Sequence, residues 1–150
     1  MQPLSCPLCP PADTQDIIWR NDQLRVIAVG GTEFPGYTRV IWHQHIAEMT
    51  DLDEDARKHI MEVVWAIETA VRQTLRPLKV NLAQFGNQVP HLHWHVIPRW
   101  QLDTHFPEAI WATPPLRSAE QQREWAAMRA QKELLLPAYH EALRDGLAQC

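Results

Sequence analysis

Between residues 91 and 96 the chain alternates histidine with apolar residues, and this alternation constrains the fold more than any other feature. The stretch reads His-Leu-His-Trp-His-Val. A period of two is that of a β-strand, on which His91, His93 and His95 point to one face and the apolar residues to the other. The apolar face can pack against helices, whereas every buried imidazole needs a partner for its polar nitrogens. We therefore expect a strand whose histidine face forms a functional site.

Other parts of the chain predict strands that can pair with this one. Runs rich in β-branched and aromatic residues lie between turn signals at residues 17–19, 24–29, 37–42, 79–84 and 92–97. The last of these strands should end at Pro98, which has no N–H to donate. Because a short loop joins the last two strands, we expect them to be antiparallel neighbours.

A long helix is predicted between the third and fourth strands, from Asp53 to Arg76. Thr50 and Asp53 resemble an N-cap region, and Pro77 terminates the helix. Apolar residues recur at helical spacing and mark its buried stripe: Ile60, Val64, Ile67, Val71 and Leu75.

A second helix should run from Ser118 to Leu136, with a break at Pro137 before a last turn over residues 139–143. The order of strands, long helix and strand pair predicts one α+β domain over residues 1–150. Its sheet should be mostly antiparallel, with one long helix and a C-terminal helix.

Composition excludes several classes of protein. The chain has 150 residues, of which 45% are hydrophobic and 21% charged, as expected for one folded domain. A net charge of −4 without a Lys/Arg cluster argues against nucleic acid as the main partner. No leader and no apolar run near the roughly 18–20 residues of a membrane span is found. Three cysteines do not form an even disulfide framework, so we expect a cytoplasmic protein.

The histidine row is compatible with three chemistries. Its imidazoles could bind a catalytic zinc ion together with a ligand from elsewhere. One of them could be a general base for another nucleophile, although no Ser or Cys lies in the stretch. One could itself attack phosphorus, since neutral imidazole is available near pH 7. The periodicity alone leaves the first and third chemistries open.

Cys6 and Cys9 form a C-x-x-C pair in a loop that also contains Pro3, Pro7, Pro10 and Pro11. Such a pair suits a zinc ion, redox exchange or neither. No helical pattern follows directly, which weakens the redox interpretation.

Residues 86–99, which read GNQVPHLHWHVIPR, closely resemble the signature of the histidine triad (HIT) family. The resemblance extends upstream to residues 39–45 (RVIWHQH) and to Cys6 and Cys9, so it covers about residues 6 to 100. Residues 101–150 form a C-terminal extension, in which 103–111 are similar to bacterial members known as diadenosine-polyphosphate hydrolases.

This resemblance implies a protein with a HIT-like fold, usually a symmetric homodimer. Such a protein cleaves the α-phosphate bond of nucleoside phosphate derivatives. Such substrates include dinucleoside polyphosphates and nucleoside phosphoramidates, here with a purine nucleotide. His93 would be the nucleophile that accepts a nucleoside monophosphate, with one ring nitrogen held by an acceptor such as a backbone carbonyl. His95 would contact the phosphate, and His91 would support the site.

The resemblance also implies a set of nucleotide-binding residues before the triad: Asn81, Gly86, Asn87, Gln88 and Val89. Asn81 matches if one residue is missing from the loop before Gly86. Two positions depart from the family pattern. Gln88 replaces the usual Ser or Thr five residues before the nucleophile, and Glu33 is the one acidic residue available for the ribose hydroxyls after the second strand.

Family members with the cysteine pair imply a structural zinc ion held by Cys6, Cys9, His45 and His91, and no organic cofactor. Two alternatives to hydrolysis stay open. The acceptor could be phosphate or another molecule, as in a phosphorylase or nucleotidyl transferase. The chain could also be a nucleotide- or zinc-binding interaction module with little turnover.

Overall fold

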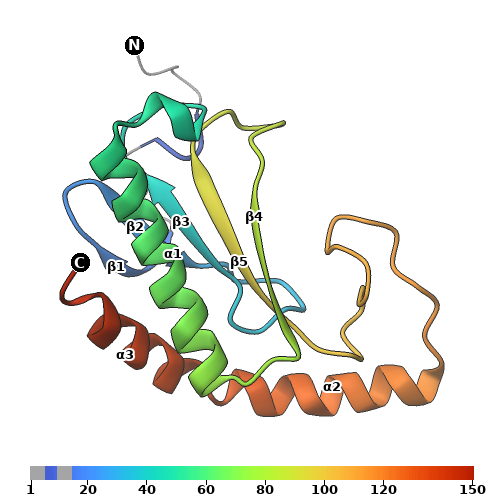
Figure 1. The fold of residues 1–150 in the computed structure, drawn as a ribbon. Coiled ribbons are helices and arrows are strands. Elements are labelled where there is room, and N and C mark those ends of the chain that lie inside the picture. Colours follow the sequence, from blue (N-terminus) through green and yellow to red (C-terminus); the bar gives the residue numbers. More distant parts are fainter. Residues whose placement is uncertain (1–5, 10–14) are drawn as a thin grey trace.

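The predicted strands form one five-stranded sheet in the computed structural model, which describes residues 6–9 and 15–150 (Figure 1). The strands are β1 (Asp16–Arg20), β2 (Leu24–Ala28), β3 (Thr38–Trp42), β4 (Lys79–Gln84) and β5 (His93–Arg99). Their order across the sheet is β1-β2-β3-β5-β4, and every neighbouring pair is antiparallel. Much of the proline-rich loop predicted around the cysteines (residues 1–5 and 10–14) lies outside the described residues.

Strand β5 differs from the prediction at both ends. It begins at His93, so His91 and Leu92 precede it, and it continues through Pro98 to Arg99. Pairing with β3 ends at Thr38 and Val96, whereas pairing with β4 continues to Arg99. The missing N–H of Pro98 faces the side where β3 no longer runs, so the proline costs the sheet no hydrogen bond. The prediction that Pro98 ends the strand was therefore wrong.

Helix α1 (Glu54–Thr74) confirms the predicted long helix to within two residues at each end. Asp53 is its N-cap and accepts a hydrogen bond from the backbone N–H of Ala56 at 2.8 Å. Thr50, in contrast, lies in a short 3₁₀ helix (Met49–Asp51). The predicted apolar stripe of α1 is buried.

The C-terminal part contains two helices, α2 (Ala119–Glu133) and α3 (Leu136–Leu147), where one helix and a last turn were predicted. Pro137 lies in the first turn of α3, where a missing N–H breaks no helical bond, so it starts a helix. Ser118 caps α2 through a reciprocal capping box with Gln121. The single C-terminal helix was therefore wrong in number, while the α+β class is confirmed.

The core lies between one face of the sheet and helices α1 and α3, which run across that face in Figure 1. Val40 of β3 and Val96 of β5 point into this core, and Val96 does so as the alternation in residues 91–96 predicted. His93 and His95 therefore lie on the opposite face, which no helix of the described residues covers (Figure 1). Among the described residues, no helix has the length and apolarity that crossing a membrane requires.

Candidate functional site

The three histidines of the row divide between two places. His93 and His95 line a cleft on the open face of the sheet, with ring centroids 4.8 Å apart. His91 lies just before β5, is fully buried, and points toward Cys6, Cys9 and His45. The prediction that His91, His93 and His95 form one row on a strand was therefore wrong at His91, because the strand begins only at His93.

The cleft has a volume of about 580 Å³. Its lining combines the two histidines with the loop between β4 and β5, the N-terminal segment and one residue far along the chain: Pro7, Leu8, Gln15, Arg39, Phe85, Gly86, Asn87, Gln88, Val89, His93, His95 and Trp111. Arg39 is the one charged residue among these described lining residues, so the cleft favours an anionic ligand.

His93 is held in one orientation by the backbone. Its Nδ1 lies 2.6 Å from the carbonyl oxygen of His91, which can only accept, so Nδ1 carries the proton and donates. The lone pair is consequently on Nε2. Burial, and secondarily the charge of Arg39, lower the pKa of His93 below its ordinary value, whereas the bond to His91 opposes this shift. The ring is therefore a neutral imidazole with a free lone pair.

His95 is held by a tyrosine instead. Its Nδ1 lies 2.6 Å from the hydroxyl oxygen of Tyr37, and that oxygen accepts a hydrogen bond from Arg39 Nη2 at 3.3 Å. Burial, followed by the charges of His93 and Arg39, lowers the pKa of His95 to about 3. Arg39 can only donate to the Tyr37 oxygen, so among the described contacts His95 Nδ1 is the acceptor for the Tyr37 hydroxyl proton, and the neutral ring carries its own proton on Nε2. His95 is thus a hydrogen-bond donor.

Residues 86–88, in the loop between β4 and β5, line the cleft. Gly86 has a φ of +115°, a conformation that side-chain-bearing residues rarely adopt. Within the described part of the chain, no acceptor is hydrogen-bonded to the N–H groups of these three residues. Successive free N–H groups suit an anion such as a phosphate.

Two other predicted residues are placed away from the cleft lining. Asn81 lies opposite Ile97 in the sheet, and its Oδ1 accepts a hydrogen bond from Arg99 at 2.8 Å. Glu33 is exposed and pairs with Arg129 of α2 at 3.5 Å. Gln88, in contrast, lines the cleft as predicted, and Asn81 as a ligand of the nucleotide stays a prediction.

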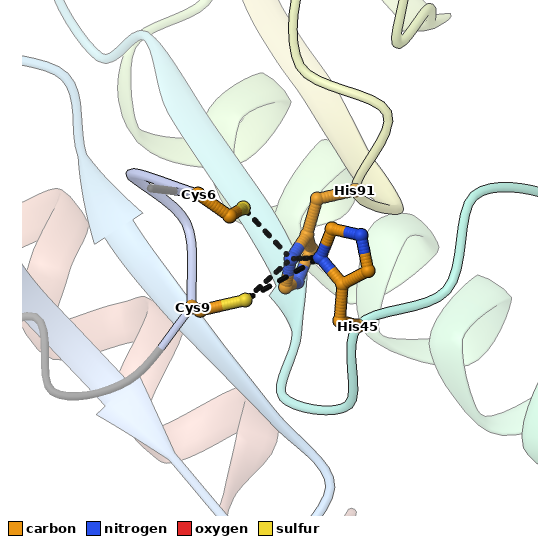
Figure 2. A group of neighbouring side chains, drawn as sticks. All are labelled: Cys6, Cys9, His45 and His91. Carbon is orange, nitrogen blue, oxygen red and sulfur yellow. Dashed lines mark hydrogen bonds between the residues drawn. The ribbon is translucent and has the colours of Figure 1, made fainter. Parts of the chain in front are cut away.

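The second place is a cluster of four potential metal ligands, Cys6, Cys9, His45 and His91, drawn in Figure 2. Their ligand atoms all lie within 4.8 Å of one another. The Nδ1 atoms of His45 and His91 are 3.2 Å apart, and the three sulfur-to-nitrogen contacts measure 3.4, 3.5 and 3.6 Å. A tetrahedral zinc ion with ordinary bond lengths places two nitrogens about 3.3 Å apart and a sulfur and a nitrogen about 3.6 Å apart. The cluster therefore fits zinc.

The surroundings of the cluster support the same conclusion. His91 donates from Nε2 to the carbonyl oxygen of Trp42 at 2.6 Å, which leaves the lone pair on Nδ1, the atom that faces the sulfurs. Burial and the neighbouring Cys6 raise the pKa of Cys9, and a cation between the two thiols would reverse that effect. With four protein ligands the site is closed, as in structural zinc sites.

Six of the described lining residues were not predicted as site residues: Pro7, Leu8, Gln15, Arg39, Phe85 and Trp111. Nor was Tyr37, which lies behind them and contacts His95. Arg39 lies directly opposite His95 in the β3–β5 register, and this pairing requires the sheet order. Trp111 comes from the irregular segment between β5 and α2, which carries no periodic signal. No pattern in the sequence would have brought these residues to the triad.

The chain resembles known proteins both in sequence and in fold. Residues 12–102 match the family model described as the HIT domain. An uncharacterised HIT-like protein of Saccharolobus solfataricus is 26% identical over 92 residues, which are 58% of this chain and 66% of that protein. The AP-4-A phosphorylase of Mycobacterium tuberculosis is 27% identical over 78 residues, which are 48% of this chain and 40% of that protein. The chain thus spans less than two thirds of the length of either relative.

Solved structures show the same fold. A histidine triad protein from Bradyrhizobium japonicum has a TM-score of 0.61 and 23% identity, with coverage of 79% of this chain and 90% of that one. A zinc-bound histidine triad family protein from Mycobacterium smegmatis has a TM-score of 0.53 and 22% identity, with coverage of 80% and 87%. The sheet with three helices matches such neighbours.

Proposed function

Because this chain belongs to the HIT domain family, we propose that it is a nucleotide hydrolase acting through a covalent intermediate on His93. Its substrates would be nucleoside phosphate derivatives, either dinucleoside polyphosphates or nucleoside phosphoramidates, cleaved at the α-phosphate. One observation carries the proposal. The bond from His93 Nδ1 to the His91 carbonyl leaves Nε2 unprotonated in a cleft that contains a donor histidine and free backbone N–H groups.

In the first step, Nε2 of His93 attacks the α-phosphorus and forms a P–N bond. The bond from phosphorus to the leaving group breaks, and its electron pair departs with the leaving atom. His95 donates a hydrogen bond from Nε2 to an oxygen of the phosphate, where negative charge develops. The backbone N–H groups of residues 86–88 would be further fixed donors to the phosphate oxygens. The Nδ1–H of His93 stays on the His91 carbonyl, which stabilises the charge on the ring.

In the second step, water attacks phosphorus and the P–N bond breaks, so the electron pair returns to Nε2. The products are a nucleoside monophosphate and the regenerated neutral His93, and a proton from water passes to solvent. Two steps through an intermediate each require less activation than direct hydrolysis.

A phosphorylase is the second candidate, because one relative of this chain is named AP-4-A phosphorylase. In that case inorganic phosphate replaces water in the second step and the product is a nucleoside diphosphate. Arg39 supports this candidate, since it is the charged residue of the described cleft lining and could hold a second phosphate.

Zinc in this proposal is structural. Cys6, Cys9, His45 and His91 would hold it, and the ion would supply no chemistry beyond tying the N-terminal segment to the residues before β5. Fixing His91 also fixes the carbonyl oxygen that accepts from His93. The cluster would thereby orient the nucleophile, His93, through the carbonyl group of His91.

The test is a substrate panel of diadenosine tetraphosphate and adenosine phosphoramidate, with products separated by chromatography in phosphate-free and phosphate-containing buffer. A hydrolase gives AMP in both buffers, whereas a phosphorylase gives ADP from diadenosine tetraphosphate only when phosphate is present. His93→Ala should lose turnover by several orders of magnitude while AMP still binds. Absence of product from every substrate would contradict the proposal.

A further inference from the structure

Two half-exposed aromatic side chains stand at the cleft beside His95. Phe85 of the β4–β5 loop is 49% exposed and Trp111 is 50% exposed. Their ring centroids are 4.8 Å apart and the rings are nearly perpendicular, at 78°. Trp111 also lies 5.0 Å from the ring of His95, at 72°. The three rings form a corner, and all three residues line the cleft.

Trp111 lies beyond the residues matched by the family model, which ends at residue 102, yet the described structure anchors its segment firmly. Asp103 is buried, pairs with Arg99 at 2.8 and 3.0 Å, and accepts from the backbone N–H groups of residues 105 and 106. Arg117 donates to backbone carbonyl oxygens of the same segment. Ile110, next to Trp111, packs against the small core of Phe34, Tyr37 and Ile97. Trp111 is therefore held in place at the cleft.

Burying half-exposed aromatic rings against a ligand is favourable. The arrangement of these rings favours a ligand that is itself flat. Aromatic side chains bind flat rings through stacking and edge-to-face contacts. Arg39 and the loop over residues 86–88 line the same cleft and supply groups that suit phosphate. A flat ring linked to phosphate is the chemistry of a nucleotide.

We propose that Trp111 and Phe85 form a binding site for a nucleobase of the substrate, supplied by a segment outside the HIT domain match. The proposal rests on the proposed function only in taking the ligand to be a nucleotide. The base is either that of the transferred nucleotide or that of the leaving group. Since Trp111 contacts the His95 ring, the bound base lies next to the reacting phosphate.

The experiment is calorimetric binding to Trp111→Ala and Trp111→Phe in a His93→Ala background, which prevents turnover. Trp65→Ala is the matched control, because Trp65 is 53% exposed on α1, on the other side of the sheet. Loss of one stacked base should weaken binding by about 5- to 150-fold in Trp111→Ala. Trp111→Phe, which keeps a ring, should bind nearly as tightly as the parent, and Trp65→Ala should bind equally well.

Three ligands distinguish the two bases. If Trp111 holds the base of the transferred nucleotide, Trp111→Ala weakens AMP and diadenosine tetraphosphate alike. If it holds the base of the leaving group, diadenosine tetraphosphate is weakened while AMP and adenosine 5′-tetraphosphate are not. Either result supports the site, and ribose 5-phosphate, which has no base, should be unaffected.

Equal affinity of Trp111→Ala and its parent for all these nucleotides would overturn the inference. The outcome is independent of the proposed function, because binding is measured without turnover. A protein that binds nucleotides through Trp111 but hydrolyses none would retain the base site and lose the hydrolase proposal. A protein that hydrolyses these substrates but binds them equally well with and without the Trp111 ring would retain the hydrolase proposal and lose the base site.

Discussion

Replacing Tyr37 by Phe should slow turnover without changing the shape of the cleft. The change removes one oxygen atom, which lies 2.6 Å from His95 Nδ1, and keeps the buried aromatic ring of residue 37. Without the hydroxyl, Nδ1 of His95, a residue that is only 4% exposed, has no hydrogen-bond donor among the described residues, and the ring is no longer forced to carry its proton on Nε2. The phosphate then loses a fixed donor.

The size of the effect follows from the cost of leaving a buried acceptor unsatisfied, which is about 1–3 kcal/mol. If the reaction needs His95 in the donor form, that cost adds to the barrier. At 1.36 kcal/mol for each factor of ten, kcat should fall by about 5- to 150-fold. The free energy of unfolding should also fall, by about 1–3 kcal/mol, for the same reason.

Tyr139→Phe is the matched control. Tyr139 is fully buried, and its hydroxyl oxygen lies 2.7 Å from Thr38 Oγ1 on the helix side of the sheet, so the variant loses a similar hydrogen bond away from the cleft. It should lose similar stability and keep its kcat. The assays are steady-state kinetics, denaturant unfolding, and ¹⁵N NMR of the His95 ring, which should show the proton on Nε2 in the wild type. Equal kcat in Tyr37→Phe and the wild type would refute the role given to Tyr37.

Three further predictions concern the metal, pH and assembly. Protein purified without chelator should contain one zinc ion per chain. Cys9→Ser should lower the melting temperature, whereas Cys150→Ser, which changes an exposed thiol, should not. Elemental analysis that finds no zinc in the purified protein would contradict the metal site. The folded state keeps the pKa of His95 at about 3, below the ordinary 6.5. The contribution of this group to the free energy of unfolding should therefore be complete above pH 6.5 and fall toward pH 3, by up to about 1.4 kcal/mol per pH unit. Denaturant unfolding of His95→Asn should show a shallower dependence of stability on pH than the wild type, and an unchanged dependence would contradict the assignment. The family resemblance predicts a homodimer that buries at least about 1,000 Å². Light scattering that gives only the 17.4 kDa monomer would exclude it.

The face of the sheet that carries the site was predictable because burial imposes a period. Val96 must reach the core, so on a strand His95 must point away from it. The same argument failed at His91, because the strand begins two residues later and His91 is drawn toward the cysteines. Where a period stops depends on contacts with distant segments, here the carbonyl of Trp42 on β3.

The cleft contained residues that no local pattern could predict. Arg39 reaches His95 only because β3 and β5 are neighbours in that register, and the sequence does not state the strand order. Trp111 depends on the buried pair of Arg99 and Asp103, which fixes an irregular segment. Pro137 illustrates a different difficulty, since proline both ends and begins helices and local sequence does not decide between them.

The covalent intermediate on His93 is the central claim, and one measurement tests it directly. Wild-type protein is mixed with diadenosine tetraphosphate that carries an isotopic label in the α-phosphate, quenched within milliseconds under conditions that preserve a P–N bond, and mapped by peptide mass spectrometry. The geometry predicts an adenylyl group on His93, and no labelled peptide from His93→Ala. Label on another residue, label on no histidine, or normal turnover in His93→Ala would contradict the mechanism.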